Sequence, residues 1–207
     1  MQSFIFDFDG TIVDSRELAW EFISAKAESL GYTTETIRSL SAKDLLQVLG
    51  IQPWQVPWYM WRVRRAFSLN MHDQPLYEGM DILLKELAEN GSRVFVVSSN
   101  SKKNIDRYLE NFDARHHVED VVSEFSLFGK AKRIRKLMQD YSVDPSHCFY
   151  IGDEVRDIHA AKANKIKSIA VTWGYNSEER LVQADPDFIV STPAELKSLK
   201  LGVKNAC

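Results

Sequence analysis

Cysteine is scarce in this chain of 207 residues, which contains only Cys148 and Cys207. Two cysteines cannot form a disulfide framework, so we expect stability to come from a packed core, for which the chain is long enough. The sequence also lacks any apolar run approaching the roughly 20 residues that cross a bilayer. No basic segment followed by an apolar one precedes the first apolar run at 4–6. We therefore expect a cytoplasmic protein without a membrane partner.

An excess of charge of one sign is missing as well. The chain has 26 basic and 29 acidic residues, and its formal net charge is −3. Proteins that bind nucleic acid through its phosphates usually present a surplus of basic residues. The composition therefore gives no reason to expect a nucleic-acid partner, and its apolar fraction of 44% is that of an ordinary globular protein.

Short apolar runs alternate with segments of helical spacing from Gly79 onward. Continuous apolar runs such as 94–97 are typical of parallel strands that are buried on both faces. The alternation predicts an α/β fold with a Rossmann-like parallel sheet, in which ligands bind at the carboxyl ends of the strands. The predicted strands here are 94–97, 121–122, 148–151, 168–172 and 188–190, and the predicted helices are 81–89, 102–111, 130–140 and 155–164.

The segment 15–75 has a different character, because it contains no convincing strand. We predict one helix from 15 to 30, a second after the capping-box spacing of Ser41 and Asp44, and a third from 57 to 70. This predicts a small all-helical cap at 15–75, inserted after the first strand. The Rossmann-like core then comprises 1–14 and 76–207.

Polar side chains follow the predicted strands at the edge where a ligand site is expected. Asp7 and Asp9 end the first strand, and Gly10 introduces a turn that can aim both carboxylates at one site. Taken alone, these could be solvated acids at a strand end. The other polar residues at the same edge are Thr11, Ser98, Ser99, Asn100, Lys130, Asp153, Glu154 and Asp157.

The order of these residues resembles the four motifs of the haloacid dehalogenase-like superfamily. The matching residues are Asp7-x-Asp9-Gly10-Thr11, Ser98, Lys130 and Gly152-Asp153-x-x-x-Asp157. The resemblance covers essentially the whole chain and is nearest to the capped branch of the phosphoglycolate phosphatases. It implies a phosphatase that works through an aspartyl-phosphate on a small phosphorylated substrate, with phosphoglycolate as the first candidate.

The resemblance also implies roles for the individual residues. Asp7 would be the nucleophile, Asp9 the general acid and then base, and Lys130 the cation that neutralises the phosphate and Asp7. Catalysis would further use Ser98. The substrate phosphate would be bound by Ser98, Ser99, Asn100, Lys130, Gly10 and Thr11.

An all-oxygen site with few carboxylates suits Mg²⁺, which we expect as the cofactor. The expected ligands are Asp7, the backbone carbonyl of Asp9, Asp153 and Asp157. Asp157 could instead cap its helix, and either Asp157 or Glu154 could act through water.

Several alternatives stay open at this point. A second acid at Asp9 argues against a halide-displacing enzyme, but a phosphomutase carries the same motifs. A phosphonate hydrolase would need a Schiff-base lysine from the cap, where nothing distinguishes Lys26 or Lys43. A non-catalytic phosphate-binding protein could use the same fold. The sequence leaves open whether the protein is a monomer or a homodimer.

Three tryptophans of the predicted cap, Trp54, Trp58 and Trp61, share one helical face, with Arg62 and Arg65 close by. We favour the interpretation that the tryptophans pack the core of the cap, although they could also close over an anionic or aromatic substrate. The segment 173–175, Trp-Gly-Tyr, resembles one found in the same family branch. It could border the site, or its glycine could serve a turn.

Overall fold

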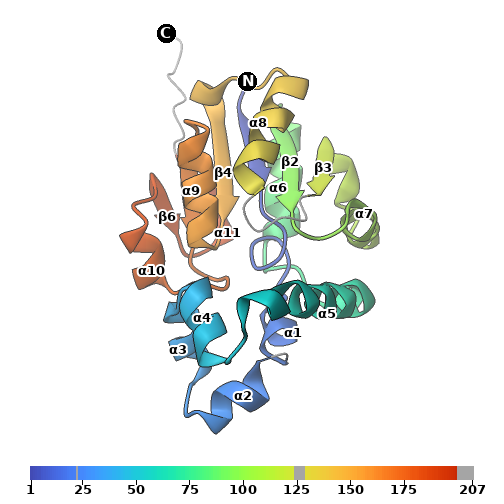
Figure 1. Cartoon of the computed structure of the whole chain (residues 1–207). Helices are drawn as coiled ribbons and strands as arrows, with labels where there is room; N and C mark the ends of the chain where they lie inside the picture. Colours follow the sequence, from blue (N-terminus) through green and yellow to red (C-terminus); the bar gives the residue numbers. More distant parts are fainter. Residues whose placement is uncertain (22, 124–128, 200–207) are drawn as a thin grey trace.

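A six-stranded parallel sheet forms the centre of the computed structural model, which describes residues 1–21, 23–123 and 129–199 (Figure 1). The strand order is β3-β2-β1-β4-β5-β6, and every neighbouring pair is parallel. The predicted Rossmann-like α/β fold is thus confirmed. The strands are β1 (Ser3–Phe6), β2 (Arg93–Ser98), β3 (Asp120–Ser123), β4 (Cys148–Gly152), β5 (Lys167–Val171) and β6 (Phe188–Val190).

Successive side chains of β1 point to opposite faces of the sheet and contribute to two separate hydrophobic layers. Phe4 and Phe6 belong to one layer and Ile5 to the other, and all three are buried. Burying one such side chain contributes roughly 1.5–3 kcal/mol. Cys148 is a buried core residue, as expected, and Cys207 lies outside the described residues.

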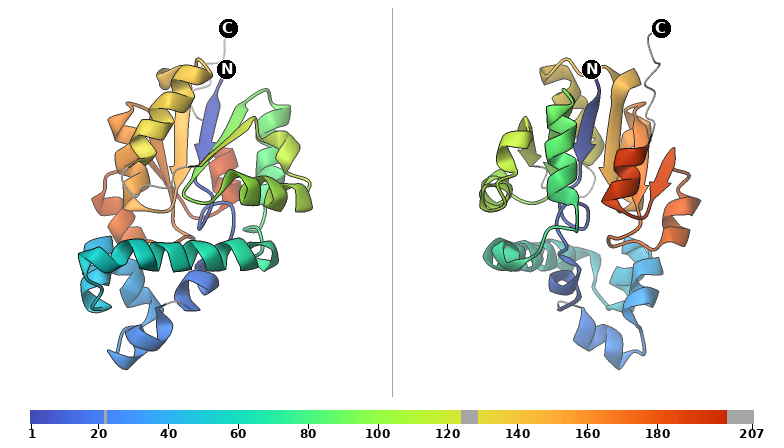
Figure 2. Two further views of the ribbon diagram at one scale, coloured as in Figure 1. Left: turned by 45° about the vertical axis from the view of Figure 1, so that its right-hand side comes forward. Right: turned by 180° about the vertical axis from the view of Figure 1, so that it is seen from behind.

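Helices cover both faces of the sheet (Figures 1 and 2). The layer of Phe4 and Phe6 includes side chains of α6 (Met80–Glu89), α7 (Lys102–Asn111) and α11 (Pro193–Ser198). The layer of Ile5 includes side chains of α8 (Lys130–Asp140) and α9 (Val155–Ala163). α10 (Glu178–Gln183) packs Leu181 in a smaller cluster with residues of α9 and β5.

The central position of β1 brings three strand ends together. In the register of the sheet, Phe6 lies beside Val96 of β2 and Ile151 of β4. The residues that follow these strands therefore emerge at one edge, as a parallel sheet requires. This register places the sequence motifs within reach of one another.

In the described residues between β1 and α6, five α-helices lie together beyond the carboxyl ends of the strands (Figures 1 and 2). The two connections to this helical part run side by side, because Asp14 N donates to Pro75 O at 2.9 Å and Tyr77 N donates to Ile12 O at 3.1 Å. The division into core and cap at 14/15 and 75/76 stays a prediction. The helices are α1 (Arg16–Glu21), α2 (Ser24–Ser29), α3 (Thr34–Ser39), α4 (Ala42–Val48) and α5 (Val56–Asn70).

The prediction of one continuous helix from 15 to 30 is wrong, since α1 and α2 are separate. Ile23, just before α2, stays in the right-handed region, but its φ of −119° is far from the roughly −63° of a regular helix. β-Branched and aromatic residues such as Ile23 and Trp20 lose side-chain freedom in a helix, which weakens the segment where they gather. The predicted end at Gly31 is correct, and this glycine has φ 78°. The predicted cap at Ser41 is also correct, since its side chain accepts from Asp44 N.

The interpretation that three tryptophans pack the core of the cap is wrong as well. Trp54, Trp58 and Trp61 are 75%, 52% and 55% exposed. Arg62 lies over the ring of Trp58 at 4.8 Å, and Arg65 lies over that of Trp61 at 5.5 Å. Helical spacing shows which residues share a face, but only the tertiary arrangement decides whether that face is covered.

Within the described part of the chain, no helix is long and apolar enough to cross a membrane.

Candidate active site

The loop after β1 holds its first carboxylate deep in the protein. Asp7 N donates to Ile151 O at 2.8 Å, which extends the pairing with β4 by one residue, and Asp7 is only 3% exposed. The chain then turns at Gly10, which has φ 79°. A Cβ at this position would lie 2.4 Å from Oδ2 of Asp153. Both the backbone conformation and the close approach therefore require glycine here.

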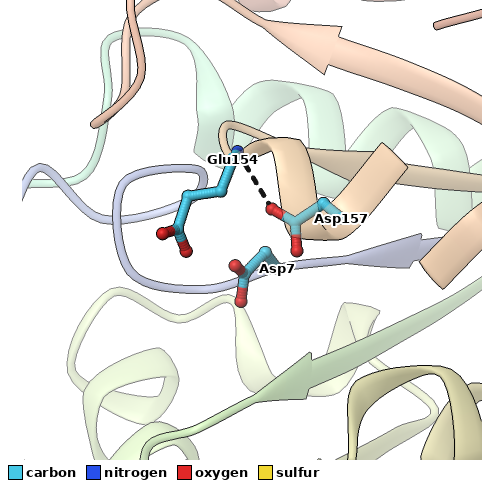
Figure 3. Close-up of side chains that lie close together, drawn as sticks. All are labelled: Asp7, Glu154 and Asp157. Carbon is cyan, nitrogen blue, oxygen red and sulfur yellow. Dashed lines mark hydrogen bonds between the residues drawn. The ribbon is translucent and has the colours of Figure 1, made fainter. Parts of the chain in front are cut away.

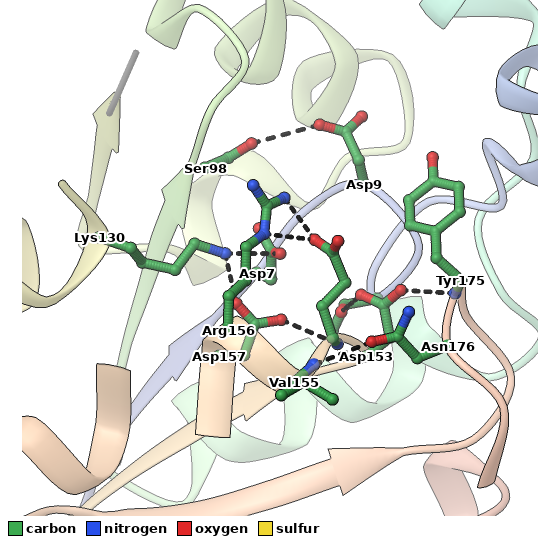
Figure 4. A network of polar contacts seen from close by, with 12 residues as sticks. Asp7, Asp9, Ser98, Lys130, Asp153, Val155, Arg156, Asp157, Tyr175 and Asn176 are labelled. Carbon is green, nitrogen blue, oxygen red and sulfur yellow. Dashed lines mark hydrogen bonds and ion pairs between the residues drawn. The ribbon is translucent and has the colours of Figure 1, made fainter. Parts of the chain in front are cut away.

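Lys130 joins two buried carboxylates at the start of α8. Its Nζ donates to Asp7 Oδ2 at 2.7 Å and to Asp157 Oδ1 at 2.5 Å (Figure 4). All three side chains are at least 90% buried. Burial alone would lower the pKa of Lys130, but the charges of Asp157 and Asp7 outweigh it and raise that pKa well above its usual value. The lysine is thus a permanent positive charge beside Asp7.

Asp7, Glu154 and Asp157 form an acidic cluster that could hold a metal ion. One carboxylate oxygen of each lies within 4.8 Å of the others, and Figure 3 shows the side chains turned toward a common space. Oxygen donors suit a hard divalent cation such as Mg²⁺. Among the described residues, the charges of four acids (Asp7, Asp153, Glu154 and Asp157) and of two cations (Lys130 and Arg156) act on one another here, so the site has an excess of negative charge that a metal ion would offset. The residues present therefore fit a divalent metal.

Asp153 lies beside this cluster and is held by the neighbouring loops. Its Oδ1 accepts from Thr11 Oγ1 at 2.7 Å, and its Oδ2 accepts from Tyr175 N at 2.6 Å. Burial, together with the charges of Glu154 and Asp7, raises the pKa of Asp153 well above its usual value. The expected metal ligands Asp7, Asp9, Asp153 and Asp157 stay a prediction, to which the geometry adds Glu154.

Arg156 is a site residue that the sequence did not indicate. Its Nε donates to Glu154 Oε2 at 2.6 Å, which leaves the other carboxylate oxygen of Glu154 for a further partner (Figure 4). The sequence signal for this contact is that Glu154 and Arg156, an acid and an arginine, stand two positions apart just after a strand. The motif Gly152-Asp153-x-x-x-Asp157 leaves the position of Arg156 unspecified, so it predicts no role for this side chain.

Asp9 points away from the acidic cluster, toward the end of β2. Its Oδ2 accepts from Ser98 Oγ at 3.3 Å, and Ser98 Oγ in turn accepts from Asn100 N at 3.0 Å. Burial, followed by the charge of Asp7, raises the pKa of Asp9 to about 7. Among the described residues, Asp9 Oδ1 and Asn100 Nδ2 are buried and make no hydrogen bond of good geometry, although the Asn100 side chain lies close enough to Asp9 to oppose part of the rise in its pKa. Ser99, between Ser98 and Asn100, is half-buried.

The loop after β5 packs directly against these acids. Trp173 Nε1 donates to Thr11 O at 3.1 Å, so this loop supports the turn after Asp9. A Cβ on Gly174 would lie only 2.2 Å from Cβ of Asp153. Close approach to Asp153, rather than a left-handed turn, therefore explains this glycine.

Gly174→Ala is expected to cost about 1–3 kcal/mol of stability, because the added methyl must displace Asp153 or the loop. We also expect kcat/KM to fall at least about tenfold, since a small displacement of a site group is costly. Denaturation curves and steady-state kinetics measure both effects. Gly91→Ala is the control, because its Cβ would meet no atom within 4 Å and only its φ of 76° causes strain. Unchanged kinetics in Gly174→Ala would contradict the packing argument.

The fold and the site together define a class of protein. The parallel sheet of this α/β fold has, at its carboxyl edge, a buried aspartate paired with a lysine, and an acidic cluster. Two buried polar atoms without a hydrogen bond in the described structure, Asp9 Oδ1 and Asn100 Nδ2, lie near the hydroxyl of Ser98. Such an edge can bind an anionic ester and a divalent metal side by side.

Comparison with known proteins identifies the family. The profile of the haloacid dehalogenase-like hydrolases matches residues 4–171, and the chain belongs to this family of enzymes. It is 32% identical to the phosphoglycolate phosphatase of Synechococcus elongatus over 95% of each chain. It is 23% identical to a 5'-nucleotidase of Pseudomonas aeruginosa, over 94% of this chain and 93% of that one. A haloacid dehalogenase-like hydrolase of Streptococcus pneumoniae shares the fold with a TM-score of 0.73 at 21% identity, covering 96% and 97% of the two chains.

Proposed function

We propose that the protein is a Mg²⁺-dependent phosphatase that hydrolyses a small phosphomonoester through an aspartyl-phosphate at Asp7. The observation that carries this proposal is the buried Asp7, which touches Lys130 at 2.7 Å and shares the acidic cluster with Glu154 and Asp157. The similarity to a phosphoglycolate phosphatase supports the same chemistry and makes phosphoglycolate the first ester to test.

Asp7 attacks phosphorus with a carboxylate oxygen while the bond from phosphorus to the ester oxygen breaks. A second step then hydrolyses the aspartyl-phosphate, so one difficult reaction is divided into two easier ones. Phe8 N donates to Asp7 Oδ1 at 2.8 Å and Lys130 donates to Oδ2, which together hold the carboxylate in one orientation. Lys130 also reduces the repulsion between Asp7 and an anionic phosphate.

Asp9 supplies and removes protons in the two steps. With a pKa of about 7, its carboxyl group can carry a proton near neutral pH. Because Oδ2 accepts from Ser98, we assign the proton to Oδ1, which has no partner among the described residues. The group protonates the leaving oxygen and, once ionised, takes a proton from the attacking water.

The phosphate oxygens would be bound by donors at the ends of β1 and β2. Asn100 Nδ2 is buried without a partner within the described structure, so it is available to bind an anion. Ser98, Ser99, Lys130, Gly10 and Thr11 complete the proposed phosphate site. When bound, Mg²⁺ would neutralise part of the phosphate charge, held by Asp7, Glu154 and Asp157 together with the expected ligands Asp9 and Asp153.

Mg²⁺ is expected to stabilise the protein as well as activate it. Binding to the folded state at 100 times Kd raises the free energy of unfolding by about 2.7 kcal/mol. We therefore expect a higher Tm in Mg²⁺ than in EDTA, and phosphate release from a panel of monoesters only in Mg²⁺. Glu154→Gln should weaken the thermal shift, since one ligand loses its charge. An unchanged Tm together with EDTA-resistant release would contradict the proposal.

The same panel separates the rival enzymes. A phosphomutase would form an isomeric phosphate ester without releasing inorganic phosphate. A phosphonate hydrolase would form an adduct with a cap lysine that borohydride can trap. Lys43 is exposed, and the side chain of Lys26 lies outside what the structure describes.

A further inference from the structure

A pocket of about 640 Å³ opens between the cap helices and the core, beside the acidic cluster. Its walls come from α1, α3, α4 and the loops that follow β4 and β5. Glu154 belongs both to this wall and to the acidic cluster with Asp7. Tyr175 also lines the pocket, and it packs against Gly10 and lies close enough to Asp9 to feel its charge. The part of a substrate that leaves, to which Asp9 gives a proton, therefore has this pocket next to it.

The wall that the cap contributes is largely apolar. Trp20 of α1 presents a large aromatic side chain and is half-buried, so part of its surface is available to a ligand. The apolar side chains of the cap that line the pocket are Ala19, Trp20, Ile23, Ile37, Leu40 and Leu45. A surface of this kind gains free energy when it removes apolar groups of a ligand from water.

The charges of the pocket do not favour a second anion. In the described lining, four acids (Asp14, Glu17, Glu35 and Glu154) stand against two arginines (Arg16 and Arg38). Because Glu154 is already paired with Arg156, three acids and two arginines remain, and the excess is one negative charge. A carboxylate or second phosphate on the leaving group would therefore find no surplus cation here.

Both of these arginines already have partners. Arg16 donates to the two carboxylate oxygens of Asp14 at 2.8 and 2.7 Å. Arg38 donates to Glu35 at 3.2 Å and to Thr172 O at 3.0 Å, which also ties the cap to the loop after β5. Each guanidinium of the described lining therefore already has a carboxylate partner, and of the Arg38 group only the buried Nε makes no hydrogen bond.

The volume of the pocket also favours a large, uncharged leaving group. A pocket of about 640 Å³ is in the range that takes a drug-sized ligand, much larger than the two-carbon acid of phosphoglycolate. We propose, on the basis of the phosphatase function above, that the substrate is a phosphomonoester of an uncharged alcohol with an aromatic or extended apolar body, which packs against Trp20.

Three phosphate esters whose leaving groups have similar chemistry test this proposal. Ethyl phosphate, 2-phenylethyl phosphate and phosphoglycolate all release an alkyl alcohol, so differences in rate report the pocket rather than the strength of the broken bond. We expect kcat/KM for 2-phenylethyl phosphate to exceed that for either of the others by at least about tenfold. Phosphoglycolate as the best of the three would overturn the proposal and leave the phosphatase function in place.

Variants at Trp20 show whether this preference comes from the pocket. Trp20→Ala should reduce the ratio of 2-phenylethyl to ethyl phosphate at least about fivefold, whereas Trp20→Phe, which keeps a ring, should retain most of it. Trp54→Ala is the matched control, because Trp54 is 75% exposed and lies outside the pocket. A ratio that is unchanged in Trp20→Ala would overturn the proposal.

Failure of the phosphatase function can be distinguished from failure of this proposal. If no ester is hydrolysed, calorimetric binding of the same esters to the wild-type protein still compares the leaving groups. Tighter binding of 2-phenylethyl phosphate that is weakened in Trp20→Ala would support the pocket assignment without catalysis. Equal binding of the esters would overturn it.

Discussion

Asp7→Asn is expected to lower kcat for phosphate release at least about 10⁴-fold, because an amide cannot replace the carboxylate as nucleophile. The fold should survive the change. Lys130 keeps its contact with Asp157 at 2.5 Å, and the amide oxygen can still accept from Phe8 N. The variant is isosteric, so the strand end retains its packing. The effect should appear in kcat with every ester, since it concerns the chemical step.

The measurement compares steady-state phosphate release in Mg²⁺ with the Tm of each protein. Asp120→Asn is the control: this carboxylate, at the start of β3, pairs with Lys102 and is 27% exposed. We expect its kinetics to stay within about twofold of wild type, as for a surface substitution away from the site. Intact mass should confirm that the introduced asparagine has not deamidated. Turnover at the wild-type rate in Asp7→Asn would disprove the aspartyl-phosphate mechanism.

Lys130→Ala is expected to cost about 3–5 kcal/mol of stability and to abolish most of the activity. Removing one partner of a buried ion pair leaves an uncompensated buried charge, and here Asp7 and Asp157 both lose their cation. Their side chains are only 4% and 1% exposed, so water cannot replace the lysine. Urea denaturation without divalent metal measures the loss.

The same helix provides a control for this prediction. Lys136 of α8 is 62% exposed and pairs with Asp140 on the surface, and Lys136→Ala should change stability by less than about 0.5 kcal/mol. Adding Asp157→Asn to Lys130→Ala should restore part of the loss, since one unpaired carboxylate becomes neutral. If Lys130→Ala and Lys136→Ala were equally stable, the buried pairing would not support the fold as described.

Much of the core could be predicted because its signals are local. The apolar run at 94–97 has no polar side for water, so it had to be a strand buried on both faces, and β2 includes it. The predicted helices 102–111 and 130–140 match α7 and α8 at both ends. α3, α10 and α11 were not expected, since helices of six residues are too short for a clear periodic pattern.

The sequence predicted which residues lie at this edge of the sheet, but it did not predict how their side chains are arranged. Residues after parallel strands must emerge at one edge, which is why Asp7, Ser98 and Lys130 were expected together. Side-chain direction in a loop has no such rule. The structure turns Asp9 toward Ser98 and Glu154 toward Asp7, and it surrounds Asp153 with Thr11 and Tyr175.

By itself, the sequence determined the parallel α/β core, the order of its motifs and the presence of carboxylates and a lysine at one edge, because apolar periodicity and strand ends are properties of the chain. Only the tertiary structure decided that Trp54 faces solvent while Trp20 lines a pocket, and that Arg16 and Arg38 already have partners there. The physical reason is that burial and pairing depend on which segments, distant in sequence, come into contact. Spacing along one helix carries no information about that contact.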